Sequence, residues 1–224
     1  MHQPSPPFDA RAARRLREAL GMAPGHVAYG LRVQYGLLVD PETVAGWERG
    51  LTVPDEQELT ALAGVLWCSP AELIAAPGTL REHRVALGLS VEELARRTGV
   101  SPSAYQRMEE EGRWRGNQRQ TLALAEALRL GPRALVTATG GDEPLAELLR
   151  DAATTRWQAY VKPVAKLVPL PKPIVESALR ELHTEYHARM VAISSWGRAS
   201  EATGDEGRAY LDGITGHFWA AVGP

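Results

Sequence analysis

The sequence predicts an all-α protein in which two similar helical units are followed by a helical tail. Apolar residues recur three or four positions apart along most of the 224-residue chain, which is the spacing of one helix face. The segment LAGVLWCSPAEL at 62–73 aligns without gaps on LAEALRLGPRAL at 124–135. Glycine and capping residues divide these stretches into short helices. We therefore expect two tandem five-helix units, with domain boundaries at 1–10 (flexible leader), 11–78, 79–140 and 141–224.

The internal similarity extends beyond the aligned segment. Arg17 to Gly21 corresponds to Arg84 to Gly88, and Trp47-Glu48 precedes Gly50 much as Met108-Glu109 precedes Gly112. Residues 11–78 are called the first repeat below, and residues 79–140 the second repeat.

Start and stop signals define the first helices of the second repeat. A helix that begins near Leu80 ends at Gly88, because glycine readily adopts the left-handed conformation of a helix C-terminus. Ser90 is a capping residue for the next helix, and Glu93 three positions later predicts a capping box. This second helix carries Leu94 inward.

A tight turn and a third helix follow. Gly99 ends the second helix, Ser101 caps the third, and Pro102 occupies its first position. Two short helices joined by such a turn pack at a steep angle, which is the helix-turn-helix arrangement. Residues 80–101 follow the pattern L-R-x-x-R-x-x-x-G-L-S-x-x-x-L-A-x-x-x-G-V-S, which resembles the Cro/C1-repressor (XRE) family of bacterial regulators.

The resemblance covers residues 80–135 well and residues 13–75 less well. It implies two lambda-repressor-like helix-turn-helix domains and a role in binding double-stranded DNA. In such domains the third helix enters the major groove and its outward residues meet base edges. The resemblance also implies that Glu109 pairs with Arg84 inside the fold.

The outward face of the third helix of the second repeat predicts the DNA contacts. Tyr105 and Met108 lie three positions apart and are expected to face the core, whereas Gln106 and Arg107 face outward. Glutamine and arginine can make bidentate contacts to adenine and guanine, and the arginines of the following loop can hold phosphates. The expected DNA-binding residues are Ser90, Ser101, Ser103, Gln106, Arg107, Arg113, Arg115, Asn117 and Arg119.

Charge supports the second repeat as the DNA-binding part. The net charge is −2 for the whole chain, but residues 79–140 hold ten arginines and seven acids, whereas the flanking parts are net negative. The alternative is a solvated charged face, and the acids Glu110 and Glu111 on the same helix would repel phosphates unless they turn away.

The first repeat departs from the pattern. A six-residue insert, at about 30–35, lengthens the expected turn, and the corresponding third helix at 41–49 has Glu42, Thr43, Ala45 and Gly46 on its outward face. This face offers almost no donor for a base or phosphate, although Arg17 and Glu48 remain placed for the internal pair. We interpret this repeat as a packing or protein-contact module, with a second DNA-reading repeat as the alternative.

The tail pattern predicts further helices. We expect helix at 144–160, an interruption by prolines over 162–172, an amphipathic helix from Ile174 to Trp196, a loop at 197–207 and a last helix at 208–222. His183 and His187 lie one turn apart, but no third metal ligand is identifiable. The tail aromatic residues are typical of a core or dimer interface, or alternatively of a ligand pocket.

Composition excludes several classes. No apolar run approaches the roughly 20 residues that span a bilayer. The single cysteine, Cys68, fits a reducing cytoplasm and a packed core thiol. No phosphate loop, nucleophile elbow or metal signature is present, so no catalytic residue, cofactor or metal is expected.

The first functional hypothesis is therefore a cytoplasmic transcription regulator that dimerises through its tail, with a small-molecule effector left open. The second is a protein-interaction adaptor that keeps the helix-turn-helix fold without binding DNA; the near-neutral charge favours it. An enzyme is the third.

Overall fold

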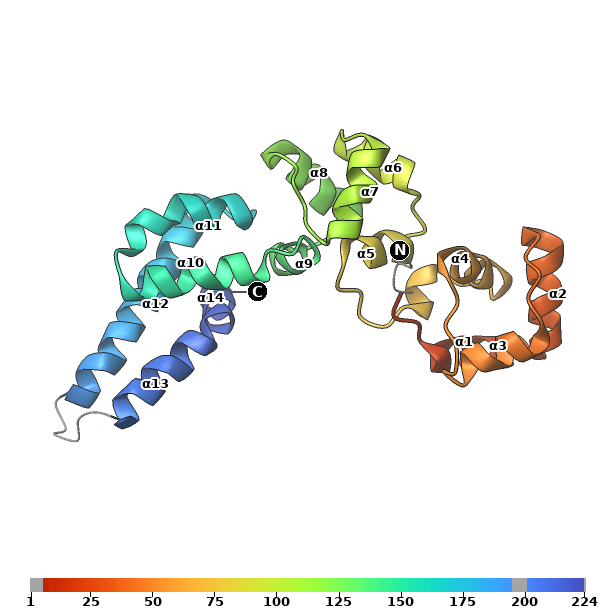
Figure 1. Cartoon of the computed structure of the whole chain (residues 1–224), viewed down its shortest axis with the longest axis horizontal. Helices are drawn as coiled ribbons and strands as arrows, with labels where there is room; N and C mark the ends of the chain where they lie inside the picture. Colours follow the sequence, from red (N-terminus) through yellow and green to blue (C-terminus); the bar gives the residue numbers. More distant parts are fainter. Residues whose placement is uncertain (1–5, 195–200, 224) are drawn as a thin grey trace. The chain divides into compact units, whose positions relative to one another are not determined.

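A computed structural model describes residues 6–194 and 201–223, with side chains for 6–191 and 206–223. Within these ranges the secondary structure is entirely helical apart from turns and one isolated β-bridge (Figure 1). The all-α class predicted from the sequence is confirmed. None of the described helices is both long and apolar enough to cross a bilayer.

The first repeat contains four α-helices and one short 3-10 helix: α1 (Ala10–Ala19), α2 (Pro24–Tyr35), α3 (Pro41–Glu48), α4 (Glu56–Val65) and η1 (Pro70–Leu73). The second contains five α-helices: α5 (Leu80–Ala86), α6 (Val91–Thr98), α7 (Pro102–Glu111), α8 (Gln118–Leu128) and α9 (Pro132–Ala138). The tail contains α10 (Asp142–Thr154), η2 (Trp157–Tyr160), α11 (Val161–Leu167), α12 (Lys172–Ser194), α13 (Glu201–Asp212) and α14 (Ile214–Val222).

The chain forms two compact units, each described here by itself. The first comprises 1–116 and 126–128, and the second comprises 117–125 and 129–224. This division does not fall at residue 140, where the sequence pattern placed the end of the second repeat. Val136 of α9 explains part of the difference, because its side chain packs in the tail core with Leu145 and Leu149.

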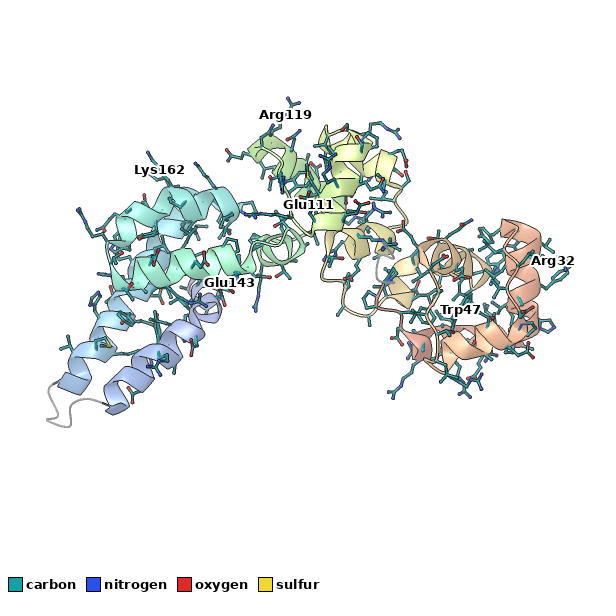
Figure 2. The ribbon with its side chains drawn as sticks, in the orientation of Figure 1. Arg32, Trp47, Glu111, Arg119, Glu143 and Lys162 are labelled. Atoms are coloured by element: carbon teal, nitrogen blue, oxygen red, sulfur yellow. The ribbon has the colours of Figure 1, made fainter. Side chains whose placement is uncertain are left out.

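The core of the first repeat surrounds Trp47, which is 2% exposed and points between the helices (Figure 2). Val27 and Leu31 of α2, Val44 of α3 and Leu62 of α4 belong to the same cluster. Val44 and Trp47, three positions apart on the third helix, are both buried and form its inward side.

The insert of the first repeat lengthens the helix more than the turn. Helix α2 continues through Tyr35 and ends at Gly36, which has a φ of 69°. Residues 30–35 contain only one glycine, Gly30, and no proline, so the helix has no reason to stop before Gly36. The connection to α3 spans residues 36–40, against 99–101 between α6 and α7, so the expected longer turn is confirmed in part.

The expected leader is shorter than ten residues. The amide of Asp9 donates to the Leu73 carbonyl at 2.8 Å, and the amide of Ala75 donates to the Pro7 carbonyl at 2.8 Å. Phe8 packs against the first-repeat core and pairs with Ile74 as a β-bridge. The prediction of a flexible leader over 1–10 is thus wrong for residues 7–10, because Phe8 has apolar surface to bury.

The two repeats share a small core within the first unit. Leu59 of α4 and Ile74 pack with Val85 and Ala86 of α5, and Phe8 covers the edge of this cluster. Helices α4 and α5 are thereby held together by apolar contacts that the sequence pattern of either repeat alone did not indicate.

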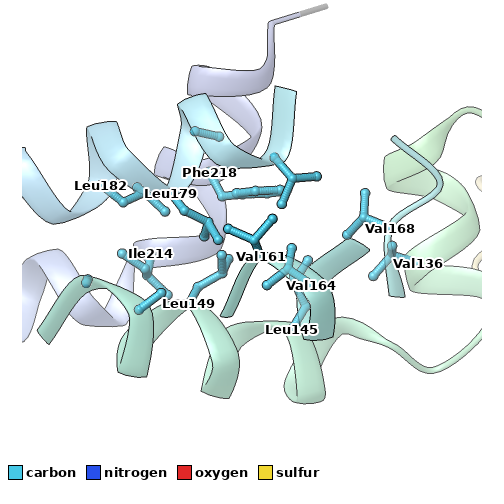
Figure 3. Packing of buried hydrophobic residues seen from close by; sticks show 14 of the residues in the cluster. Val136, Leu145, Leu149, Val161, Val164, Val168, Leu179, Leu182, Ile214 and Phe218 are labelled. Atoms are coloured by element: carbon cyan, nitrogen blue, oxygen red, sulfur yellow. The ribbon is translucent and has the colours of Figure 1, made fainter. Parts of the chain in front are cut away.

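The tail core lies between α10, α11, α12 and α14 (Figure 3). Leu149, Val164, Leu179 and Phe218 are each fully buried within it. The interruption by prolines expected over 162–172 is confined to residues 168–171, between α11 and α12. Pro163 instead lies in the first turn of α11, where its missing N–H has no intrahelical partner to lose.

The segment expected as a loop at 197–207 is helical from Glu201 onward, in α13. The glycines and acids that suggested a loop are tolerated because the helix packs on α12: a Cβ on Gly207 would lie 3.1 Å from Met190 Sδ. Residues 195–200, including Trp196 at the predicted helix end, lie outside the described residues.

Candidate nucleic-acid interface

Helix α7 is placed by its two ends. The Ser101 hydroxyl accepts a hydrogen bond from the Ala104 amide at 3.3 Å, and Pro102 occupies the first turn. Gly99 before the helix and Gly112 after it have φ values of 69° and 61°, conformations that favour glycine. The predicted signals at Gly99 and Ser101 set where this helix begins, and Gly112 sets where it ends.

The capping of α6 is simpler than expected. The Ser90 hydroxyl accepts from the Glu93 amide at 3.1 Å, which confirms the cap. The reciprocal half of the predicted capping box does not form, because the Glu93 carboxylate pairs with Arg97 one turn later.

The inner side of α7 is anchored by Tyr105. Its side chain is fully buried and contacts Trp114 edge-on, with ring centroids 6.4 Å apart. Burial and the nearby Glu109 carboxylate raise the pKa of the Tyr105 hydroxyl, which therefore stays neutral. Met108 is half-buried on the same side.

A buried ion pair connects α7 to α5. Arg84 Nε donates to Glu109 Oε1 at 2.7 Å and Nη2 donates to Glu109 Oε2 at 3.0 Å, as the resemblance implied. The Arg84 residue is 2% exposed. Such a bidentate contact restricts both the position and the rotation of α7.

The outer side of α7 carries polar and basic side chains. Ser103, Gln106 and Arg107 are exposed, as predicted, and Arg113 is exposed just after the helix. Among the described side chains, neither Arg107 nor Arg113 has an ion-pair partner within 4.0 Å. These two guanidinium groups are therefore available to an external acceptor.

The three consecutive acids at the end of α7 each have a partner. Glu109 binds Arg84, Glu110 accepts a hydrogen bond from Gln106 Nε2 at 3.0 Å, and Glu111 pairs with Arg115 at 2.8 Å. Much of the repulsion expected from these acids is thus compensated locally. The same contacts occupy Gln106 and Arg115, which would have to exchange partners to contact DNA, a constraint not visible in the sequence.

Two of the predicted contact residues belong to the second compact unit. The Asn117 side chain accepts from the Gln120 amide at 3.0 Å and so caps α8. Arg119 is exposed and points away from α8 (Figure 2). DNA contacts by Asn117 and Arg119 remain predictions.

Comparison with known families agrees with this geometry. Residues 78–138 match a family model described as a helix-turn-helix domain. The helix-turn-helix domain thus includes α5 to α9, and α7 follows its turn. No curated protein and no solved structure matched the chain.

The first repeat retains the internal pair that the helix-turn-helix domain uses. Arg17 Nε donates to Glu48 Oε1 at 2.6 Å, which confirms the expected contact. On α3, however, Gly46 is buried and not outward, because the Leu51–Val53 segment covers it and a Cβ there would lie 3.1 Å from Thr52 Oγ1. Of the expected outward set only Glu42 is exposed, and Thr43 and Ala45 are half-buried, so this face of α3 offers no basic side chain.

The histidines of the tail do not assemble a metal site. His183 Nδ1 lies 3.0 Å from the Ala153 carbonyl oxygen, and its ring contacts that of His187 at 4.2 Å between centroids. Among the side chains that the structure describes, no three His, Cys, Asp or Glu residues are close enough to bind a metal ion together.

Cys68 is a packed thiol, as expected, and its reactivity is predicted to be low. Burial, with a smaller contribution from Glu72, raises its pKa from 9.0 to about 11. Because the thiolate is the nucleophile, alkylation of the folded protein at pH 8 should be about a hundredfold slower than for a free thiol. Timed iodoacetamide labelling, with urea-unfolded protein as the reference, checks this; equal rates would contradict it.

Proposed function

We propose that this protein is a sequence-specific transcription regulator of the XRE type that reads the major groove with α7 of the second repeat. The observation that carries the proposal is the division of α7 into two sides. Tyr105 and Glu109 hold the inner side, while Arg107, with Arg113 after the helix, presents unpaired guanidinium groups outward. A helix that is held on one side and presents arginines without ion-pair partners on and just beyond its other side fits a groove lined by phosphates.

Each side chain has a distinct expected role. Arg107 suits bidentate donation to guanine, and Gln106 suits adenine once it exchanges Glu110 for a base. Arg113 suits a phosphate, and such a contact fixes the register of the protein on the duplex without selecting a base sequence. The amino-terminal turns of α6 and α7, with Ser90 and the Ser101–Ser103 segment, add backbone amides and a favourable dipole for phosphate oxygens.

A two-fold dimer is part of the proposal. One short helix contacts too few base pairs to select a site in a genome, so two copies on a palindromic site are expected. The tail is the proposed dimerisation or effector domain, and it supplies a separate helical core for that role. Light scattering of the purified protein tests the dimer.

The test of the function begins with selection of binding sites from random duplexes, followed by gel-shift titration. We expect Arg107→Ala to weaken binding to the selected site about tenfold or more and to relax base preference at one position. Arg113→Ala should weaken binding to all sequences similarly and reduce the salt dependence of affinity. Arg32→Ala is the matched control, because Arg32 is an exposed arginine of α2 in the first repeat. This variant should leave affinity and base preference unchanged.

Failure of both Arg107→Ala and Arg113→Ala to alter affinity would contradict the proposed reading surface. A wild-type protein that selects no site and shows no salt-dependent binding would contradict the regulator function itself.

A protein-interaction adaptor is the second candidate, favoured by the surface of the first repeat. Several large apolar side chains are exposed there, including Tyr29, Val33, Leu38 and Trp67, the last 87% exposed. Exposed apolar groups of this size are typical of protein contacts. The adaptor would replace the regulator if the selection experiment gave no duplex binding.

A further inference from the structure

Glu56 connects the first repeat to the ion pair that holds α7. It is the first residue of α4, whose start is capped by Asp55. Its carboxylate accepts from Arg84 Nη1 at 2.7 Å, from Arg84 Nη2 at 3.3 Å and from Arg81 Nε at 3.0 Å. Two arginines of α5 thus converge on one acid from the other repeat.

Arg84 is consequently held between two acids from opposite sides. Its Nε and Nη2 face Glu109 of α7, its Nη1 and Nη2 face Glu56 of α4, and Nη1 also donates to the Leu89 carbonyl at 2.9 Å. Burial alone would lower the pKa of Arg84, but its hydrogen bonds with Glu109 and Glu56 raise it. The guanidinium group therefore remains charged and bridges α4 to α7.

The first repeat provides an internal comparison. Arg17 binds Glu48 through Nε and Nη2, at 2.6 and 2.7 Å, and donates through Nη1 to the Met22 carbonyl at 2.6 Å. This matches the contacts of Arg84 with Glu109 and Leu89. The second acid near Arg17 is its neighbour Glu18, at 3.8 Å, and among the described residues no acid from another repeat takes the place of Glu56. An arginine, one acid and one carbonyl are thus sufficient for the local fold, and Glu56 is an addition specific to the second repeat.

We propose that Glu56 is a positioning residue for α7 and acts through Arg84. The proposal rests on the proposed function for its effect on DNA, but the placement of α7 can be measured without DNA. The shared core of Leu59 with Val85 keeps α4 against α5, so the Glu56 carboxylate is presented to Arg84 from a rigid support. The first repeat has no basic face for contact with DNA. It would contribute to recognition by holding α7 of the second repeat in position.

The experiment uses the full chain with Glu56→Gln, which removes the charge but keeps the size of the side chain. Glu58→Gln is the matched control, because Glu58 lies on the same helix turn and its carboxylate accepts only from the Asp55 amide among its described contacts. We expect Glu56→Gln to speed amide hydrogen exchange in α7 at least threefold, with exchange in α3 of the first repeat unchanged. Affinity for the selected duplex should fall roughly three- to tenfold, a typical coupling between connected sites.

Three results would overturn the proposal: unchanged exchange in α7, an equal increase in α3 and α7 that reflects general destabilisation, or the same effect from Glu58→Gln. If the wild-type protein binds no duplex but Glu56→Gln still loosens α7 selectively, the positioning role stands and only the regulator function falls.

Discussion

Replacement of Trp47 by alanine is expected to destabilise the first unit by about 3–5 kcal/mol, the usual cost of removing a large buried aromatic side chain. Trp47 is 2% exposed at the centre of the first-repeat core, where it packs with Val44 of its own helix and Leu62 of α4. Its removal loses apolar burial and leaves a cavity that neighbouring helices fill only in part. Urea unfolding followed by circular dichroism measures the loss.

Trp67 is the matched control for this substitution. It belongs to the same repeat but is 87% exposed, so Trp67→Ala should change the free energy of unfolding by no more than about 0.5 kcal/mol. Similar losses for the two variants would mean that the first-repeat core is not arranged as described. The six tryptophans of the chain make fluorescence a poor reporter here, because both variants remove one of them.

Replacement of Arg84 by methionine should cost about 3–5 kcal/mol, because it leaves the buried Glu109 carboxylate without a counter-ion. Glu109 and Arg84 have side chains that are each 3% exposed, so water cannot compensate the loss. Affinity for DNA should fall as well, since α7 loses its link to α5. Thermal and urea unfolding, together with gel-shift titration, measure the two effects.

Arg14→Met provides the comparison for Arg84. Arg14 pairs with Glu18 at 2.8 Å, but the two side chains are 61% and 53% exposed. Exposed pairs of this kind contribute little to stability, because water and salt screen their attraction. If Arg84→Met lowered the free energy of unfolding no more than Arg14→Met, Glu109 would have to be solvated or protonated in the Arg84 variant. The buried ion pair would then not be what holds α7.

Local signals predicted much of the candidate interface correctly. Ser90 and Ser101 cap the helices that follow them, and Gly99 has the left-handed conformation that a turn of this kind needs. The burial of Tyr105 and the exposure of Arg107 followed from helical spacing alone. These features depend on residues within one or two turns of each other, which is the range over which a single sequence is informative.

The errors arose where local signals compete with packing. The prolines suggested a break over 162–172, but the break covers only 168–171, because Pro163 fits the first turn of α11. The glycine-rich segment before α14 forms α13 against α12. Phe8 appeared to belong to a loose leader because it is isolated among polar residues and prolines, but it has a place against Ile74. In each case a distant partner supplies the free energy that the local sequence lacks.

The order of short helices, their caps and the basic outward side of α7 were determined by the sequence alone, because each depends on neighbours along the chain. The tertiary structure decided the rest: the acids at the end of α7 are compensated by Arg84, Gln106 and Arg115, and Glu56 joins Arg84 from 28 residues away. Ion pairs between repeats cannot be predicted from the periodicity of a sequence. Coulomb attraction depends on the distance between the charges in space and on their burial, and not on their spacing along the chain.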